Sequence, residues 1–216
     1  MSIQEFLRNE FHLENDEVIR RLEEDAKIEM VKRGCKLVEN GEVPAYLMVL
    51  LEGVYRGYLL DEEGIDVTDC LAFRRGDIVM GCNHLGQPSI INIEMVTNGE
   101  ILMIPMTTVL PLLETSPELW RLYNQFLQEG LVRHWNCKML LLRCSAMERY
   151  QRFLEQYPGL IDVVNNKHVA SFLGMTPVTL SRLRRQLRQA EEAKTGEDTS
   201  GKTCNSSVCI KQEVTS

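Results

Sequence analysis

The side chains best suited to chemistry gather near one end of the sequence. Residues 168–187 read HVASFLGMTPVTLSRLRRQL, with Arg182, Arg184 and Arg185 in the second half and Arg188 just after it. Guanidinium groups bind phosphates and guanine edges, and hydroxyl groups bind phosphates, so these residue types on one helix face suit a polyanion. The alternative is an ordinary helical hairpin whose arginines are solvated.

Two short helices joined by a tight turn account for this stretch. Gly174 supplies a left-handed or crowded turn, Thr176 caps the second helix, and Pro177 occupies a first-turn position that loses no hydrogen bond. This layout is typical of a helix-turn-helix, whose second helix enters the major groove of DNA. The side chains expected to pack inside are Val169, Ala170, Leu173, Met175, Leu180 and Leu183.

The outer face of the second helix then carries the candidate DNA contacts, which are Val178, Thr179, Ser181, Arg182, Arg185 and Arg188. The charge distribution agrees with this interpretation. Residues 1–142 carry a net charge of −10 and residues 143–189 a net charge of +5, in a chain of net charge −7. A basic segment on an acidic protein is expected where one part alone meets a polyanion.

The elements that must position this helix precede it. Residues 3–33 are expected to be mainly helical, with a cap at Asn15 or Asp16. Glycines then recur every 11 or 12 residues from Gly41 to Gly76, between short apolar runs, which predicts an all-β sandwich or barrel up to about residue 105.

A long amphipathic helix is predicted over 116–143, with Ser116 as its cap and Pro117 in its first turn. Its apolar arc is so broad that the helix is expected to pack on the β-domain and on a second copy of itself. Gly130 in mid-helix would permit close backbone approach. The alternative is a helix buried within a monomer. Further helices follow, and the polar residues 190–216 are expected to form a disordered tail.

Composition indicates a cytoplasmic globular protein. Hydrophobic residues make up 44% of the chain and charged residues 25%, and the longest apolar run is far shorter than the ~20 residues of a membrane span. The N-terminal segment does not read as a secretory signal. The seven cysteines form no CxxC pair, and most are expected to be small buried hydrophobes, with redox sensing or cofactor ligation as alternatives.

This order of elements resembles the Crp–Fnr superfamily of bacterial transcription regulators. The strongest motif is HVASFLGMTPVTLSRLRRQL, and NGEVPAYLMVLLEGVYRGYLLDEEG and FRRGDIV match nearly as well. The resemblance implies an α+β chain, with a cyclic-nucleotide-binding-like β-roll (jelly roll) over 1–115, a dimerisation helix over 116–143 and a helix-turn-helix domain over 144–189. It also implies a homodimer that binds palindromic double-stranded DNA, responds to an effector, and contacts RNA polymerase in some family members.

The resemblance also assigns roles to residues. Val178, Arg182 and Arg185 occupy base-reading positions, with Ser181 on the same face, and Lys167, Thr176 and Thr179 occupy phosphate-contacting positions. Family members often carry Glu where Val178 stands; Glu accepts from cytosine, whereas Val offers apolar contact, for instance to a thymine methyl group. No β-hairpin wing is visible after Gln189.

The effector is expected to differ from those of the known branches. Cyclic-nucleotide binders place Glu after a Gly and Arg before a Ser or Thr, but here Cys82 follows Gly81 and Pro88 precedes Ser89, which argues against cyclic AMP. No cysteine precedes Cys35, which argues against an iron–sulfur cluster. The favoured effector is an unidentified small organic molecule.

Other functions remain as alternatives. Cys82 and His84 lie where haem-containing carbon-monoxide sensors of the family keep their ligands, so a haem- or thiol-based sensor of gas or redox state is one. A cupin-like metal-dependent enzyme is remote, because only His84 of the four histidines lies in the β-domain. The third alternative is a protein-interaction adaptor that kept the fold but lost effector and DNA binding. The sequence therefore predicts a DNA-binding regulator rather than an enzyme.

Overall fold

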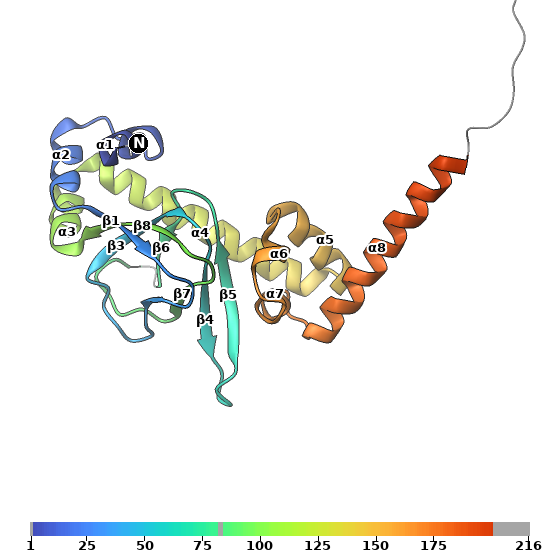
Figure 1. The fold of residues 1–216 in the computed structure, drawn as a ribbon. Helices are drawn as coiled ribbons and strands as arrows, with labels where there is room; N and C mark the ends of the chain where they lie inside the picture. The colour runs from blue at the N-terminus through green and yellow to red at the C-terminus, as the bar shows by residue number, and fades with distance from the viewer. Residues whose placement is uncertain (1, 82–83, 201–216) are drawn as a thin grey trace, which may run out of the picture.

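A β-roll and a small helical domain are joined by one long helix in the computed structural model, which describes residues 2–81 and 84–200 (Figure 1). The helices and strands follow the chain as α1 Ile3–Asn9, α2 Asp16–Glu24, β1 Lys27–Val31, β2 Lys36–Val38, β3 Tyr46–Glu52, β4 Tyr55–Leu60, β5 Asp66–Ala72, β6 Ile78–Val79, β7 Asn92–Met95, β8 Gly99–Pro105, α3 Met106–Thr115, α4 Pro117–Arg143, α5 Ala146–Gln156, α6 Leu160–Val163, α7 Asn166–Phe172 and α8 Pro177–Ser200.

The β-roll consists of two four-stranded antiparallel sheets, as the glycine spacing predicted. One sheet has the strand order β1-β8-β3-β6 and the other β2-β7-β4-β5. Their inner faces share a core in which Met48 and Leu50 of one sheet accompany Ile93 and Met95 of the other. β4 and β5 form a hairpin that projects from the roll (Figure 1).

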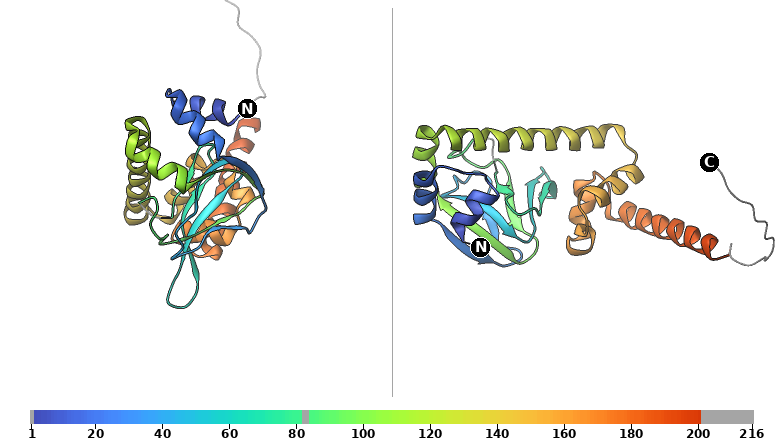
Figure 2. Two further views of the ribbon diagram at one scale, coloured as in Figure 1. Left: turned by 90° about the vertical axis from the view of Figure 1, so that its left-hand side faces the viewer. Right: turned by 90° about the horizontal axis from the view of Figure 1, so that it is seen from above.

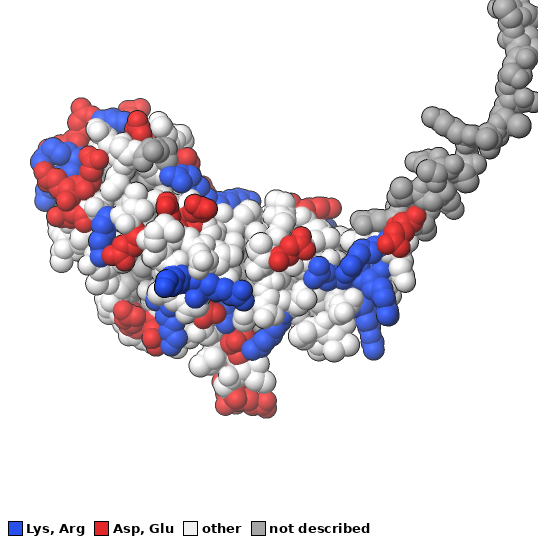
Figure 3. Space-filling model, viewed as in Figure 1, with Lys and Arg blue, Asp and Glu red and all other residues white. Residues whose placement is uncertain are grey.

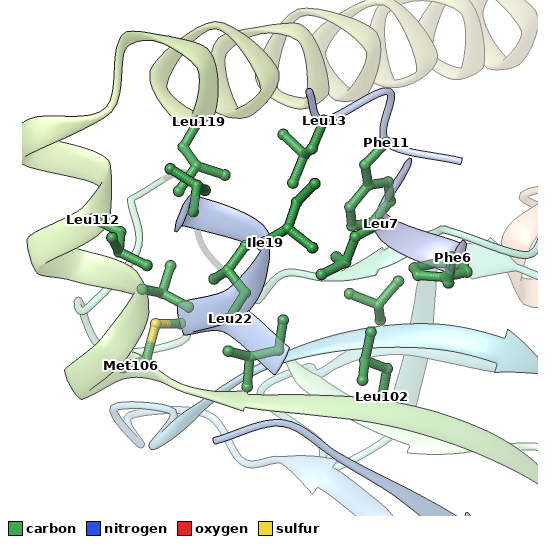
Figure 4. Close-up of a cluster of buried hydrophobic side chains, with 14 of the residues drawn as sticks. Phe6, Leu7, Phe11, Leu13, Ile19, Leu22, Leu102, Met106, Leu112 and Leu119 are labelled. Atoms are coloured by element: carbon green, nitrogen blue, oxygen red, sulfur yellow. The ribbon is translucent and has the colours of Figure 1, made fainter. Parts of the chain in front are cut away.

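The N-terminal helices cover one end of the roll (Figure 1), and Figure 4 shows the apolar side chains that they bury there. Ser2 closes a capping box with Glu5, and the Asn15 side chain caps α2 by accepting from two backbone N–H groups. The helices bury apolar side chains, including Leu7 and Ile19, against β8, α3 and the start of α4. The helical prediction for residues 3–33 is wrong at residues 27–31, because β1 pairs with β8, from Lys27 opposite Met103 to Val31 opposite Gly99.

α4 spans the gap between the two domains (Figure 2). The Ser116 hydroxyl caps it by accepting from the N–H of Leu119. Leu119 and Tyr123 in the first two turns are buried, but Leu131, Trp135 and Leu142 are 59%, 62% and 69% exposed. The helix is therefore not buried within one chain, and the apolar arc predicted to meet a second copy is uncovered.

The helical domain has its own core, which extends into the β-roll. Phe153 of α5, Val169 of α7 and Leu180 of α8 are almost fully buried together. Leu71 of β5 and Val96 of the β7–β8 turn belong to the same cluster. The β-roll and the helix-turn-helix thus share apolar contacts as well as the α4 connection.

α8 is longer than the sequence predicted. Residues 190–200, expected to begin a disordered tail, continue the helix to Ser200, because this segment contains good helix formers such as Ala, Glu and Lys. The remaining tail residues, 201–216, lie outside the described residues. Neither α8 nor any other helix within 2–81 and 84–200 is long and apolar enough to cross a membrane.

Candidate nucleic-acid interface

The turn before α8 has the geometry that its glycine predicted. Gly174 adopts a left-handed φ of +61°. Its N–H donates to the Ser171 carbonyl over 3.0 Å, and the Met175 N–H donates to the Ala170 carbonyl over 3.0 Å. A Cβ at Gly174 would lie 3.0 Å from Cδ2 of Leu141 on α4. The left-handed backbone therefore favours glycine, and a Cβ here would also displace the Leu141 methyl group.

The start of α8 is fixed by Thr176. The Thr179 N–H donates to Thr176 Oγ1 over 3.2 Å, and the Leu180 N–H donates to the Thr176 carbonyl over 3.0 Å. Pro177 is the first helical residue. The two threonine hydroxyls lie 3.0 Å apart on the exposed end of the helix. The predicted cap is confirmed; the contact of these hydroxyls with phosphate stays a prediction.

One side of α8 forms what we call the recognition face, made of Val178, Ser181, Arg182, Arg185 and Arg188. All five are exposed, Val178 by 61%, and together they line one open hollow along the helix. Basic side chains gather over α8 (Figure 3). Within the described residues, none of the three arginines forms an ion pair, so their guanidinium groups are available to an external anion.

Arg184 has a different role from its neighbours. It points away from the recognition face, donates to Asn166 Oδ1 over 2.9 Å and lies 3.6 Å from an Asp162 carboxylate oxygen. These contacts tie α8 to α6 and α7. Arg184 therefore orients the recognition face.

Lys167 lies apart from the recognition face, at the start of α7. Its Nζ donates to Asp66 Oδ2 of β5 over 3.1 Å. Asp66 also accepts from Arg56, which is 3% exposed and whose Nε donates to Glu94 Oε1 over 2.8 Å. Lys167, which was predicted to contact a DNA phosphate, is thus bound to the β-roll in this conformation.

We call Arg56, Asp66, Glu94, Lys167 and His168 the interdomain node. Partial burial favours the protonated form of Asp66, but hydrogen bonds from Arg56 and Lys167 outweigh it and lower the pKa of that carboxyl. This node could not be predicted from the sequence, because its members come from four separate elements, β4, β5, β7 and α7. Nearby, the Thr68 N–H donates to the Ser171 hydroxyl over 2.9 Å, which adds a second hydrogen bond between the domains.

His168 is the titratable member of the node near neutral pH. Its Nδ1 lies 3.7 Å from Asp66 Oδ1, is buried and has no hydrogen-bond partner within the described residues. Burial and the nearby Arg56 lower the pKa of His168 below its ordinary value of 6.5, against the pull of Asp66. The neutral imidazole is therefore the form that fits the docked domains.

A cavity of about 160 Å³ lies between the β-roll and α4. Tyr55 and Cys70 line it from the sheet, and Gly130 and Arg133 line it from the helix. No described atom outside the adjacent backbone lies within 4 Å of a Cβ at Gly130, so within one chain this glycine borders the cavity, and its close approach to a second copy stays a prediction. Burial raises the pKa of Cys70 to about 12, which disfavours thiolate chemistry at this position.

The loop expected to recognise an effector is only partly described. Cys82 lies outside the described residues, so the proposed haem pair of Cys82 and His84 stays a prediction. Ser89 is 2% exposed and donates to the Ile91 carbonyl over 2.7 Å. This hydroxyl, next to the position where cyclic-nucleotide binders keep Arg, is thus turned into the protein. Within 2–81 and 84–200, no three metal-ligating side chains cluster as a metal site would require.

Comparison with solved structures identifies the fold. No family model and no curated protein matches the sequence. Among solved structures, FixK2 from Bradyrhizobium japonicum is similar, with a TM-score of 0.69, 19% identity, and coverage of 77% of this chain and 86% of that one.

Two further structures agree with this. A putative transcriptional regulator of the crp/fnr family from Eubacterium rectale has a TM-score of 0.65 and 18% identity, covering 85% of this chain and 87% of that one. The c-di-GMP-responsive global regulator CLP from Xanthomonas campestris has a TM-score of 0.65 and 14% identity, covering 82% and 93%. The chain therefore has the fold of the Crp–Fnr regulators, as its sequence predicted.

Replacement of Gly174 by alanine should destabilise the helix-turn-helix. The left-handed conformation alone costs a Cβ about 1–2 kcal/mol, and displacement of Leu141 should add roughly 1 kcal/mol. Gly159→Ala is the matched control, because Gly159 has a φ of +76° in the same domain but nothing within 4 Å of its Cβ. Urea unfolding of both variants measures the difference, and equal losses would contradict the packing argument.

Protonation of His168 should weaken the protein as the pH falls. An unfolded imidazole takes up its proton near pH 6.5 and the docked one only at lower pH, so the unfolded state gains protons first and stability is lost below about pH 6.5. Urea unfolding measures the free energy of unfolding at pH 7.5 and at pH 5.5. The decrease between the two should be smaller for His168→Gln than for the natural sequence. An equal pH-dependent loss for the two proteins would contradict this role of His168.

Proposed function

We propose that this protein is a DNA-binding transcription regulator of the Crp–Fnr type, which acts as a homodimer and responds to a small organic effector. The observation that carries the proposal is the recognition face: three arginines without ion pairs in the described chain, beside a capped helix start, on the exposed side of α8. In a helix-turn-helix this surface enters the major groove, where Arg donates two hydrogen bonds to guanine.

The contacts divide by chemistry. Arg182 and Arg185 read bases, and Thr176 and Thr179 bind phosphate through their hydroxyl groups at the start of the helix. Val178, exposed near the first turn, contacts an apolar group such as a thymine methyl. The operator half-site therefore differs from that of relatives with Glu at this position.

The second half of α4 supplies the dimer seam. Leu131, Trp135 and Leu142 follow one another at spacings that keep them on one side of the helix, and all three are more than half exposed. An exposed apolar stripe of this size is characteristic of an interaction surface. A second α4 packed on it would set two recognition faces on one DNA duplex, as a palindromic operator requires.

The interdomain node supports control of DNA binding by the β-roll. The ammonium group of Lys167 donates one hydrogen bond to Asp66, 3.1 Å away, so Asp66 and a DNA phosphate attract the same charge. β5 lines the 160 Å³ cavity between the β-roll and α4, and it also carries Asp66. An effector bound in this cavity would therefore alter the contact between Asp66 and Lys167. Cyclic AMP is not the effector that we propose, since the sequence lacks the residues that hold its ribose and phosphate.

Loss of the arginines should abolish sequence-specific DNA binding. Arg182→Ala and Arg185→Ala should each weaken binding by about 1–3 kcal/mol per half-site, because each removes a bidentate contact with guanine. The measurement is fluorescence anisotropy on a duplex selected by the natural protein from a random pool. Arg33→Ala, an exposed arginine on the β-roll, is the control and should bind as the natural protein does. Unchanged affinity of the α8 variants would refute the assignment.

Charged residues on the α4 stripe should prevent dimerisation. Light scattering after gel filtration should give twice the chain mass of 24.8 kDa for the natural protein and a single chain mass for Leu131→Glu combined with Trp135→Glu. Two carboxylates brought into an apolar seam lose their hydration. Asn136→Glu, exposed on another side of the helix, should stay dimeric; a monomeric natural protein would contradict the seam.

A further inference from the structure

A second concave region lies between the two domains and belongs to neither the recognition face nor the dimer seam. This interdomain cleft, of about 880 Å³, is bounded by the β5–β6 segment, the second half of α4, α5 and the end of α7. These elements can be followed in Figure 2. Its volume is in the range of sites that enclose small organic ligands.

The cleft stays accessible when α4 pairs with a second copy. Arg133, Cys137 and Leu140 line it at spacings of four and three residues, so they share one side of α4. At 3.6 residues per turn this side lies about 180° around the helix from Leu131 and Trp135 of the dimer seam. A partner helix on the seam therefore leaves this side of the cleft open, whereas Met139, which also lines the cleft, lies beside the seam.

The cleft is positively charged in a chain whose net charge is −7. Four arginines line it, with two carboxylates that are already engaged. Asp77 accepts from the backbone N–H groups of Phe73 and Arg74 and from Arg133, over 2.9–3.2 Å. Glu148 closes the cap of α5 by accepting from the Ser145 N–H over 2.7 Å.

The other three arginines of the cleft, Arg74, Arg143 and Arg152, form no ion pair within the part of the chain that the structure describes. They come from the β5–β6 segment, α4 and α5, so the folded chain brings their charges together from three separate elements. Guanidinium groups bind the oxygens of phosphates and carboxylates, so an organic anion is the ligand that suits this lining.

An aromatic wall faces the same space. Tyr157 contacts Phe73 and Phe172, with ring centroids 5.7 Å and 5.5 Å apart, and stacks on Phe153 at 5.1 Å. Burial raises the pKa of Tyr157 to about 12, so its phenol stays neutral and can donate a hydrogen bond. Flat apolar rings pack well against such a wall.

We propose that the interdomain cleft binds a small organic anion of the nucleotide class, with its phosphate on Arg143 and Arg152 and its flat ring against Tyr157. The concave shape and the aromatic wall favour a small molecule over the DNA backbone, and no recognition-face residue lines the cleft. The ligand touches the β-roll, α4 and the helix-turn-helix domain at once, so it fixes their relative pose. This proposal does not depend on DNA binding.

Isothermal titration calorimetry on the full chain tests the site, with the four ribonucleoside 5′-monophosphates as probes. We expect saturable binding of at least one, with one ligand per chain, and at least tenfold weaker binding of its nucleoside and of inorganic phosphate. Arg143→Gln combined with Arg152→Gln should weaken binding at least tenfold. Tyr157→Leu should bring the affinity for the nucleotide close to that for phosphate.

The matched control removes the same number of arginines elsewhere. Arg33→Gln combined with Arg121→Gln, two exposed arginines outside the cleft and the recognition face, should leave nucleotide binding unchanged, and circular dichroism should show that all variants keep their helices. No saturable binding of any of the four probes would overturn the proposal, as would equal weakening by the control pair or equal affinity for inorganic phosphate. Loss of duplex binding by the cleft variants without nucleotide binding would instead assign these arginines to the DNA backbone.

Discussion

The two-sided character of α4 is the constraint on which the rest of the structure depends. In its first turns, Leu119 and Tyr123 are buried against the β-roll domain. In its last turns, Leu141 packs beside Gly174 of the helix-turn-helix. The opposite side of the same helix stays apolar and exposed. One rigid element therefore sets the distance between the domains and also presents the surface through which two chains would meet.

The contact between β5 and α7 determines how the helical domain sits against the β-roll. Arg56 is nearly buried, and its charge is balanced by Glu94 and Asp66. Asp66 forms ion pairs with both Arg56 and Lys167. Removing one partner of a buried ion pair leaves an unbalanced charge, which is costly. In the proposed regulator, Asp66 and a DNA phosphate attract the same lysine, so domain docking and DNA binding influence each other.

The elements that local chemistry controls were predictable from the sequence. Thr176, Pro177 and Gly174 mark the turn and the start of α8 within a few residues, and Ser116 marks the start of α4. β1 was missed, because its pairing with β8 joins residues some seventy positions apart and its side chains are mostly exposed. The interdomain node and the cleft were out of reach for the same reason: Arg56, Asp66 and Lys167 acquire their roles only after the domains dock. The extension of α8 was missed because polar composition alone favours a tail as much as a solvated helix.

The sequence symmetry of the DNA that the protein selects from a random duplex pool tests the central claim most directly. A dimer with two recognition faces should enrich an inverted repeat whose half-sites are centred about 10 base pairs apart, one helical turn. Each half-site should contain guanines that Arg182 and Arg185 can contact. Enrichment of such a repeat is the predicted result. A pool that stays random after repeated selection, or that converges on a site without two-fold symmetry, would contradict the account.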